Sequence, residues 1–220
     1  MDLFAAAENF AFEEALGPSA VVLRKFCQKQ EKANAEGQSL IADLSAVISQ
    51  SPLRHMVTPG GFEMSVAMTN CGELGWVSDS AGYRYQSIDP QSNDIWPAMP
   101  QSFLALARSA ALAGGFDDFL PDACLVNRYA VGSRTTLHQD KNEKDFSQPI
   151  VSVSLGLPAT FLFGGLERSQ PTRKVQLTHG DVAVWGSSSR LNYHGILALK
   201  DGEHELTGAY RYNLTFRKAG

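Results

Sequence analysis

Five polar residues in the second half of the chain have the types and spacing of a metal site with an anion site beside it. His138 and Asp140 stand two positions apart, His194 follows much later, and Arg211 and Arg217 come near the C-terminal end. If the segment around His138 is a strand, both of its polar side chains leave the same face, because side chains alternate along a strand. Two imidazoles and one carboxylate can hold a metal and leave one side of it open, as at non-haem Fe(II) sites.

A His-x-Asp tripeptide is weak evidence when it stands alone. It arises by chance in roughly one chain in a few of this length, and a histidine in a strand is more often a hydrogen-bonded structural residue than a ligand. Three observations favour the metal interpretation here. The pair follows a strand-like segment, His194 lies near the start of a later strand, and a basic strand comes after it.

That basic strand, Arg211 to Arg217, alternates cleanly. Residues 211, 213, 215 and 217 share one face, which therefore carries two guanidiniums, an amide and a hydroxyl. Buried arginines are costly unless anions meet them, and a dicarboxylate would meet both through planar, bidentate hydrogen bonds. The alternative is an exposed edge strand. If Tyr212, Leu214 and Phe216 face the core, the arginines face water.

Composition sets broad limits. The chain has 220 residues, 44% hydrophobic and 19% charged, which suits one globular domain with a sizeable core. A net charge of −4 argues against a protein that coats nucleic acid through a broad basic surface. The net charge does not exclude a local basic groove near the metal, but for each scattered charge taken singly a solvated surface is the better interpretation. The candidates for such a groove are Arg128, Arg134, Lys141, Lys144 and Arg168.

Cysteine usage and hydropathy suggest a compartment. The three cysteines, at positions 27, 71 and 124, are odd in number, widely spaced and form no Cys-x-x-Cys pair, so we expect reduced thiols. No apolar run reaches membrane-spanning length, and the first residues lack the basic start and apolar stretch of a secretory signal. We therefore expect a cytoplasmic protein, and we expect a monomer.

The first half of the chain gives mixed signals. Apolar residues recur at helical spacing over 39–50, and an Ala-rich stretch over 101–113, between Pro100 and a Gly-Gly pair, predicts a second helix. A short strand is expected at 20–23. Residues 57–98 are rich in Gly, Ser, Asn and Asp, which indicates hairpins and long loops rather than core strands. We expect a helical N-terminal half.

The second half changes to short strands separated by turn residues, which is typical of a sandwich or jelly roll. The predicted strands are 123–129, 135–139, 150–155, 160–163, 174–177, 182–185 and 210–217. No repeat, low-complexity tract or linker interrupts the chain. The sequence therefore predicts one α+β domain in which a helical half packs on a β-sandwich.

Several long segments resemble the bacterial AlkB nucleic-acid dealkylases. The matching segments are MVTPGGFEMSVAMTNCGELGW (56–76), residues 89–90 and 96–100, PDACLVNRYAVGSRTTLHQDKNE (121–143), PIVSVSLGLPATFLFGG (149–165) and RYNLTFR (211–217). The resemblance covers most of the chain. It implies a single Fe(II)- and 2-oxoglutarate-dependent dioxygenase domain over 1–220, with a double-stranded β-helix core at about 120–218 and a nucleotide-recognition lid at about 57–98.

The resemblance also implies roles for individual residues. The iron ligands would be His138, Asp140 and His194. The 2-oxoglutarate site would consist of Arg211 with Asn127, Tyr129 and Asn213, and with Ser152 and Arg217 as further contacts. The substrate residues would be Trp76 and Tyr83 in the lid, Met68 and Arg168 at base-pocket and strand-contact positions, and Thr136 at the substrate backbone.

One position departs from the pattern of the family. Two residues past Asp140, the best-known members carry an acid that faces the target base, whereas this chain has Asn142. An amide can accept a hydrogen bond, but it also donates one and carries no charge. A cationic alkylated base would therefore gain less from it, and this leaves the preference between methylated adenine and methylated cytosine open.

The implied activity is oxidative demethylation of N1-methyladenine and N3-methylcytosine in single- or double-stranded DNA, with RNA as a further candidate substrate. Fe(II) would be the metal cofactor, 2-oxoglutarate and O2 would be the co-substrates, and formaldehyde, succinate and CO2 would be released. Two alternatives remain. One is a 2-oxoglutarate oxygenase that acts on a protein or a small molecule, and the other is a non-catalytic jelly-roll binding module whose three ligand-like residues are structural.

Overall fold

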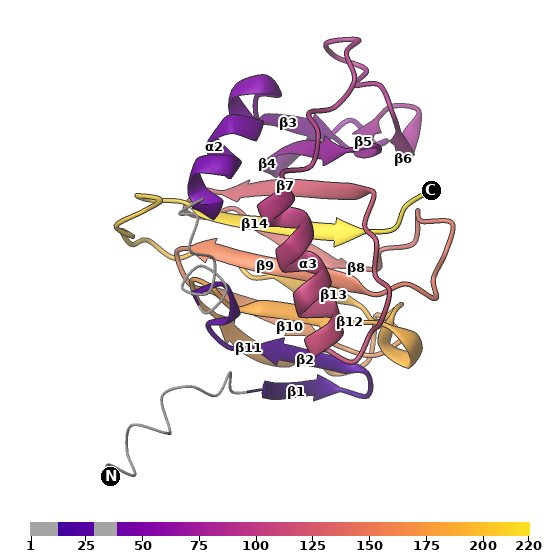
Figure 1. Ribbon diagram of the computed structural model, residues 1–220, viewed down its shortest axis with the longest axis vertical. Coiled ribbons are helices and arrows are strands. Elements are labelled where there is room, and N and C mark those ends of the chain that lie inside the picture. The colour runs from indigo at the N-terminus through magenta and orange to yellow at the C-terminus, as the bar shows by residue number, and fades with distance from the viewer. Residues whose placement is uncertain (1–12, 29–38) are drawn as a thin grey trace.

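The computed structural model describes residues 13–28 and 39–220 and shows a mostly-β fold (Figure 1). The larger sheet has eight strands in the order β1-β2-β12-β9-β14-β7-β4-β3. Their bounds are β1 Glu13–Gly17, β2 Ala20–Leu23, β12 Val182–Trp185, β9 Ile150–Gly156, β14 Arg211–Arg217, β7 Ala123–Tyr129, β4 Glu63–Gly72 and β3 Arg54–Val57.

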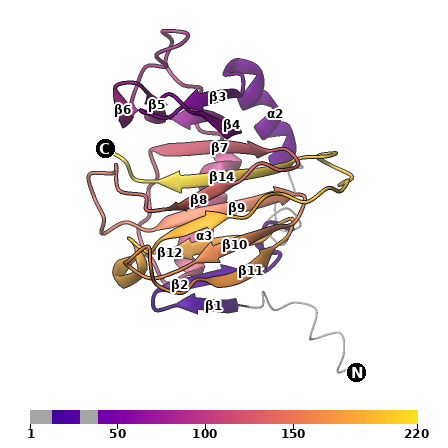
Figure 2. The same cartoon turned by 180° about the vertical axis from the view of Figure 1, so that it is seen from behind.

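A smaller sheet of four strands lies against the larger one, and Figure 2 shows it in front with α3 behind. Its order is β11-β10-β13-β8, with bounds β11 Arg173–Leu177, β10 Ala159–Phe163, β13 His194–Ile196 and β8 Thr135–His138. From β7 onward the chain repeatedly crosses between the two sheets. This places β8 and β13 opposite the central strands of the larger sheet.

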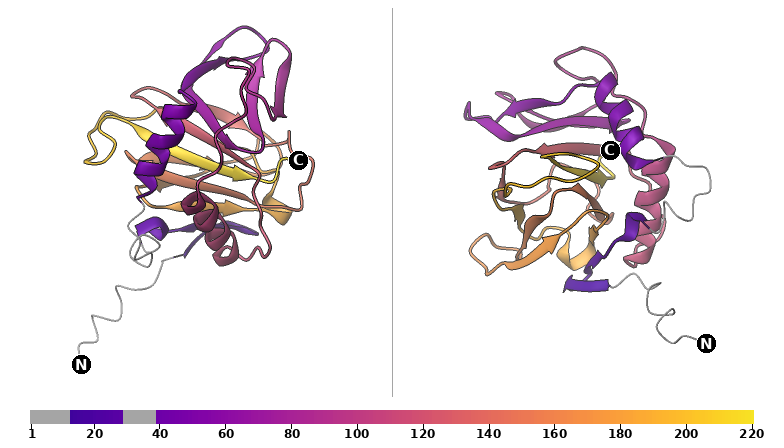
Figure 3. Two further views of the ribbon diagram at one scale, coloured as in Figure 1. Left: turned by 45° about the horizontal axis from the view of Figure 1, so that its top comes forward. Right: turned by 90° about the vertical axis from the view of Figure 1, so that its left-hand side faces the viewer.

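Among the elements that lie wholly within the described residues, the remaining ones are two helices, a hairpin and a short 3-10 turn. Their bounds are α2 Leu40–Gln50, α3 Gln101–Ala113, β5 Gly75–Asp79, β6 Gly82–Gln86 and the 3-10 turn Ser187–Ser189. The side view in Figure 3 shows both helices along one side of the sheets. Among the described residues, no helix is long and apolar enough to cross a membrane.

Because the larger sheet is covered on both sides, its central strands are buried on both faces. On one face Phe216 of β14 packs edge-on against Phe103 of α3, with ring centroids 6.0 Å apart. On the other face Trp185 of β12 contacts Phe161 of the smaller sheet, with centroids 6.0 Å apart. The expectation that an apolar face on β14 would leave its arginines in water is therefore wrong, since Arg211 is only 1% exposed.

The predicted helices at 39–50 and 101–113 are confirmed as α2 and α3, and so is the strand at 20–23. The helical N-terminal half, however, is wrong. Strands β1 to β6 all precede α3, and four of them belong to the larger sheet. Apolar residues recur at helical spacing only in α2 and α3, which contact the sheet on one side. Strands as short as β1, β2 and β3 have too few residues to show the two-residue alternation of a strand.

The interpretation of 57–98 as hairpins and loops is wrong for β4, a ten-residue strand between β3 and β7. Its polar residues suggested a loop, but Thr69 and Asn70 are fully buried. The Thr69 hydroxyl donates to Ser51 Oγ at 2.8 Å, and Asn70 bonds the backbone of Trp76. These internal partners allow polar side chains to stand in a core strand.

Candidate metal centre and its surroundings

The three predicted ligands converge at one end of the smaller sheet. His138 of β8 and His194 of β13 are paired residues, and their ring centroids lie 4.4 Å apart. Asp140 Oδ1 is 3.7 Å from His138 Nε2, and its Oδ2 is 3.7 Å from His194 Nε2. One ligand atom from each residue lies within 4.8 Å of the other two. One ion can therefore contact all three.

Gly195 makes the close approach of the two strands possible. A Cβ at this position would lie 2.8 Å from the Thr135 carbonyl oxygen, which is too close for any side chain. A larger residue would separate β13 from β8 and with it His194 from His138. The Tyr-His-Gly segment therefore places the second imidazole through backbone packing as well as through strand pairing.

Both imidazoles present the same nitrogen to the metal position. His138 Nδ1 lies 2.8 Å from the Thr136 carbonyl oxygen, and His194 Nδ1 lies 3.0 Å from that of Asn192. A carbonyl oxygen only accepts, so each Nδ1 carries the proton and each Nε2 directs its lone pair toward Asp140. Backbone acceptors of this kind orient metal-binding histidines in proteins, and the three residues fit a divalent cation.

The charges of the site also suit metal binding. Burial, together with the neighbouring His138, lowers the pKa of His194 to about 4, so that its imidazole is neutral at neutral pH, as a ligand must be. Burial alone would raise the pKa of Asp140. The charge and hydrogen bond of Arg217, together with the neighbouring His194 and His138, outweigh that effect and hold this pKa below its ordinary value. Asp140 is therefore a carboxylate.

Asp140 does not lie in the strand. The strand alternation that would place its side chain on the His138 face ends with β8 at His138, two residues earlier. Its orientation comes instead from Arg217, whose Nη2 and Nε lie 2.6 and 3.0 Å from Asp140 Oδ2. Two arginine N–H groups hold one carboxylate oxygen, and the other oxygen stays available.

Arg211, at the opposite end of β14, has a different environment. Its Nη2 donates to Ser154 Oγ at 3.0 Å, and its guanidinium lies 5.0 Å from the centre of the Tyr129 ring. Its Nε and Nη1 are buried and make no hydrogen bond to any residue that the structure describes. Burial lowers the pKa of this guanidinium. Because unpaired buried N–H groups are costly, this end of the strand fits a bound carboxylate.

A strip of polar side chains connects the Arg211 end of the strand with the metal position. Asn213 Nδ2 donates to Ser152 Oγ at 2.8 Å, and Asn213 Oδ1 accepts from Asn127 Nδ2 at 3.1 Å and from Thr215 Oγ1 at 2.9 Å. The structure thus brings the residues predicted for the cofactor together on the inner face of β7, β9 and β14.

The β5–β6 hairpin reaches the segment that follows Asp140. The rings of Trp76 and Tyr83 are stacked, with centroids 5.6 Å apart and planes 13° apart. Trp76 Nε1 donates to Asn142 Oδ1 at 3.2 Å. Tyr83 is 45% exposed, so it is not a core residue. The hairpin therefore holds an aromatic surface beside the metal position.

The other predicted substrate residues differ in how near they come. Thr136 is exposed, and its carbonyl holds His138. Arg168 is also exposed, and its guanidinium lies 5.4 Å from the centre of the Tyr193 ring, next to His194 in the chain. Met68 is buried in β4 opposite Asn127. Of these three residues, Thr136 and Arg168 are exposed to solvent, whereas Met68 is buried.

Sequence reasoning missed four residues of the site: Ser154, Asn192, Glu143 and Arg190. Ser154 follows the predicted Ser152 by two positions, and the period-two rule could have found it. Asn192 acts through its backbone, which no side-chain pattern reveals. Glu143 and Arg190 are both buried and ion-paired, with Glu143 Oε2 3.2 Å from Arg190 Nη2. Neither stands in a recognisable motif.

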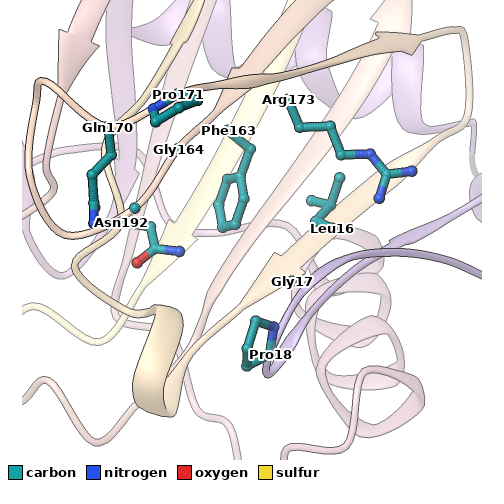
Figure 4. Close-up of a pocket in the computed structure, with 10 residues that line it drawn as sticks. Leu16, Gly17, Pro18, Phe163, Gly164, Gln170, Pro171, Arg173 and Asn192 are labelled. Carbon is teal, nitrogen blue, oxygen red and sulfur yellow. The ribbon is translucent and has the colours of Figure 1, made fainter.

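A separate hollow of about 420 Å³ lies between the turn after β1 and the loop after β10 (Figure 4). Its walls include Pro18, Phe163, Gln170, Arg173 and Asn192. None of the three metal ligands lines it. The hollow adjoins the metal centre through Asn192, whose carbonyl oxygen accepts from His194, and through Phe163, the strand partner of His194.

Comparison with known proteins agrees with this geometry. The 2OG-Fe(II) oxygenase superfamily matches residues 19–217. The chain is 59% identical over 220 residues to the alpha-ketoglutarate-dependent dioxygenase AlkB of Escherichia coli (strain K12), covering 100% of this chain and 98% of that protein. It is 56% identical over 219 residues to the AlkB of Salmonella typhimurium (strain LT2), with the same coverage of both chains.

A solved structure shows the same fold. The structure of OsALKBH1 superposes with a TM-score of 0.79 at 28% identity, covering 94% of this chain and 100% of that one. The mostly-β core and the open His-x-Asp…His facial triad are thus those of enzymes that use Fe(II) and 2-oxoglutarate, also called alpha-ketoglutarate. The chain belongs to the 2OG-Fe(II) oxygenase superfamily and, within it, to the AlkB alpha-ketoglutarate-dependent dioxygenases.

Proposed function

We propose that this dioxygenase repairs alkylated DNA, and also accepts RNA, by oxidative demethylation of N1-methyladenine and N3-methylcytosine. One observation carries the proposal. The stacked pair Trp76 and Tyr83 stands beside an iron site that is open on its His138 side, where the histidine side chain is 42% exposed. An aromatic surface next to an oxidising metal suits a flat base that carries a methyl group.

The chemistry explains why a metal is needed. The N–CH3 bond of a methylated base offers no good leaving group for hydrolysis. When bound, Fe(II) with 2-oxoglutarate and O2 supplies an oxidant that hydroxylates the methyl group, with succinate and CO2 as products. The hydroxymethyl group then leaves as formaldehyde, and the base recovers its pairing edge.

The protein residues hold the reactants in place. We infer that Arg211 binds a carboxylate of 2-oxoglutarate through its unpaired Nε and Nη1. Asn127, Tyr129, Ser152, Asn213 and Arg217 then complete or support this site. His138, Asp140 and His194 would hold the iron from one side, which would leave room for the co-substrates to bind it. Fixed positioning of this kind is the main contribution of a protein to cofactor chemistry.

The target base must leave the duplex to reach the iron, and a damaged base flips out at lower cost. We infer that it stacks on the hairpin aromatics, which contributes about 1–3 kcal/mol per base. Met68, Thr136, Asn142 and Arg168 are the further substrate contacts in this proposal. Phosphate contacts would make binding depend on salt concentration.

The proposal also covers the organisation of the chain. Residues 1–220 act as one domain, in which the strands of about 120–218 form a double-stranded β-helix. The alternation of successive strands between the two sheets supports this inference. Residues of about 57–98 form the nucleotide-recognition lid, with β4 as its anchor in the larger sheet. In this proposal the enzyme acts as a monomer in the cytoplasm.

Turnover with defined substrates tests the proposal. Protein, Fe(II) and 2-oxoglutarate are incubated with oligonucleotides that carry one N1-methyladenine or N3-methylcytosine, and both formaldehyde and the restored base are measured. We expect release only with the methylated strands and none from Asp140→Ala. Formaldehyde from a methyl-lysine peptide, without any from methylated DNA, would favour the protein oxygenase. Absence of turnover with iron bound would favour the binding module.

A further inference from the structure

The carboxylate ligand Asp140 is held from two sides by buried arginines. Arg217 binds its side chain, as described above, and Arg190 Nη1 donates to its backbone carbonyl oxygen at 2.9 Å. Arg190 is 3% exposed and Arg217 6%. Because Asp140 lies outside β8, the sheet does not fix it. The two arginines therefore determine where this ligand points.

A second buried carboxylate lies between the two arginines. Glu143 Oε1 is 3.3 Å from Arg217 Nε, and Glu143 Oε2 is 3.2 Å from Arg190 Nη2, although this second contact is too poorly aligned for a hydrogen bond. Glu143 is 6% exposed. The two carboxylates and the two guanidiniums balance in charge, as buried ions must.

The hairpin supplies one more contact to this cluster. Tyr85 of β6 donates its hydroxyl proton to Glu143 Oε1 at 2.8 Å. Tyr85 is the strand partner of Trp76, and Trp76 donates to Asn142. Two paired residues of the hairpin, Trp76 and Tyr85, thus form hydrogen bonds with two consecutive residues, Asn142 and Glu143, in the segment that follows Asp140. The lid and the ligand share one hydrogen-bond network.

We propose that Glu143 is a positioning residue for the iron site, and that Tyr85 supports it from the hairpin. Glu143 holds Arg217 and Arg190 in place, and these hold Asp140 toward the metal. The inference goes beyond the repair function, because it concerns the binding of the metal alone and needs no nucleic acid.

The charge balance gives the direction of the effect. In Glu143→Gln the Asp140 carboxylate is the one acidic partner left to Arg217 among the described residues, so Arg217 competes more strongly with the metal for it. The same change adds one net positive charge near a site that must bind a cation. In Tyr85→Phe all charges remain, and only the hydroxyl that holds Glu143 is lost.

The test is a titration of the full-length apoprotein with Co(II), which binds nitrogen and oxygen sites in the same way as Fe(II). Partners one shell beyond a metal ligand typically contribute about 10–100-fold in affinity. Glu143 acts on Asp140 through Arg217 and Arg190, so we expect Glu143→Gln to weaken Co(II) binding by the lower end of that range, about tenfold. The visible absorption of bound Co(II) should change as well, because the carboxylate meets the ion at another angle.

A double-mutant cycle separates positioning from mere stability. Tyr85→Phe should weaken Co(II) binding less than Glu143→Gln, and it should have no further effect in the Glu143→Gln background. Tyr83→Phe removes a hydroxyl from the same strand of the hairpin, where the ring is exposed. It should bind Co(II) with unchanged affinity, and urea unfolding of each variant shows that the fold is intact.

Three results would overturn the inference. Glu143→Gln could bind Co(II) with the affinity and spectrum of the unchanged protein. Tyr85→Phe could match Tyr83→Phe, or its effect could persist in full without Glu143. If Glu143→Gln does not fold, Tyr85→Phe decides, since it leaves every buried charge in place. Failure here would leave the demethylation assay unaffected, so the two proposals can be judged separately.

Discussion

The two ends of β14 both carry an arginine, but the two guanidiniums differ in whether they are paired with carboxylates of the chain. Arg211 and Arg217 lie on one face of one strand, and both are buried. Arg217 is saturated by carboxylates of its own chain, Asp140 and Glu143. Arg211 keeps two N–H groups without a partner. Folding alone therefore pairs the guanidinium at the Arg217 end of the strand, whereas the guanidinium at the Arg211 end needs a ligand to complete its hydrogen bonds.

The difference shows that burial of an arginine does not by itself reveal its role. A buried guanidinium that is paired within the chain maintains structure, whereas an unpaired one marks a binding site at some cost in stability. The loop after β8 makes the difference, because it brings both Asp140 and Glu143 to the Arg217 end of the strand.

The largest expected effect is on the free energy of unfolding, which should change in different directions when the arginine at one or the other end of β14 is replaced. Arg217→Met leaves two carboxylates short of a partner, so we expect the free energy of unfolding of the apoprotein to fall by about 3–5 kcal/mol. Arg211→Met removes an unpaired buried charge and should leave that free energy unchanged or raise it. Urea unfolding measures both. A large loss in both variants would contradict the comparison.

The next effect concerns binding of 2-oxoglutarate. Arg211→Met should weaken it by about 2–5 kcal/mol, the usual loss when one partner of a buried charged pair is removed. Calorimetry on the Mn(II)-loaded protein measures this. The matched control is Arg128→Met, because Arg128 lies over the Tyr210 ring, 4.7 Å from its centre, and has no predicted cofactor contact. Unchanged affinity in Arg211→Met would remove the assignment.

Acidic pH should lower the stability of the apoprotein through His194 at the metal site. The pKa of His194 is about 4 in the folded protein, below its ordinary value of 6.5, so the unfolded chain binds more protons between these two pH values. The free energy of unfolding of the apoprotein should therefore fall as pH falls from 6.5 to 4, by at most about 3 kcal/mol for this group. His194→Asn should lose this slope, whereas Arg211→Met should keep it. An equal slope in His194→Asn would refute the prediction.

The smallest expected effect concerns the base. Asn142 Oδ1 already accepts from Trp76, and the amide has no charge to offer a cationic lesion. Asn142→Asp should raise kcat/KM for N3-methylcytosine relative to the neutral N3-methylthymine by several-fold, on the order of 1 kcal/mol. Competition assays with both lesions in one oligonucleotide mixture measure the ratio. An unchanged ratio would mean that residue 142 does not contact the base.

The sequence predicted this comparison only in part. Period-two alternation correctly placed residues 211, 213, 215 and 217 on one face, and the three ligands followed from their types. It could not distinguish Arg211 from Arg217, because Glu143 and Arg190 come from separate loops without a motif. It also missed β4, since a strand buried on both faces shows no alternation and its polar residues are satisfied only in the folded chain.

One consequence follows from the place of β8 in its sheet. β8 is an edge strand of four residues that pairs with β13 alone. An ion shared by His138 and His194 therefore acts as a staple across the last pair of strands, joining segments that are distant along the chain. Loss of the ion should loosen the molecule first at this edge, and amide hydrogen exchange in β8 should report whether iron is present before any substrate is added.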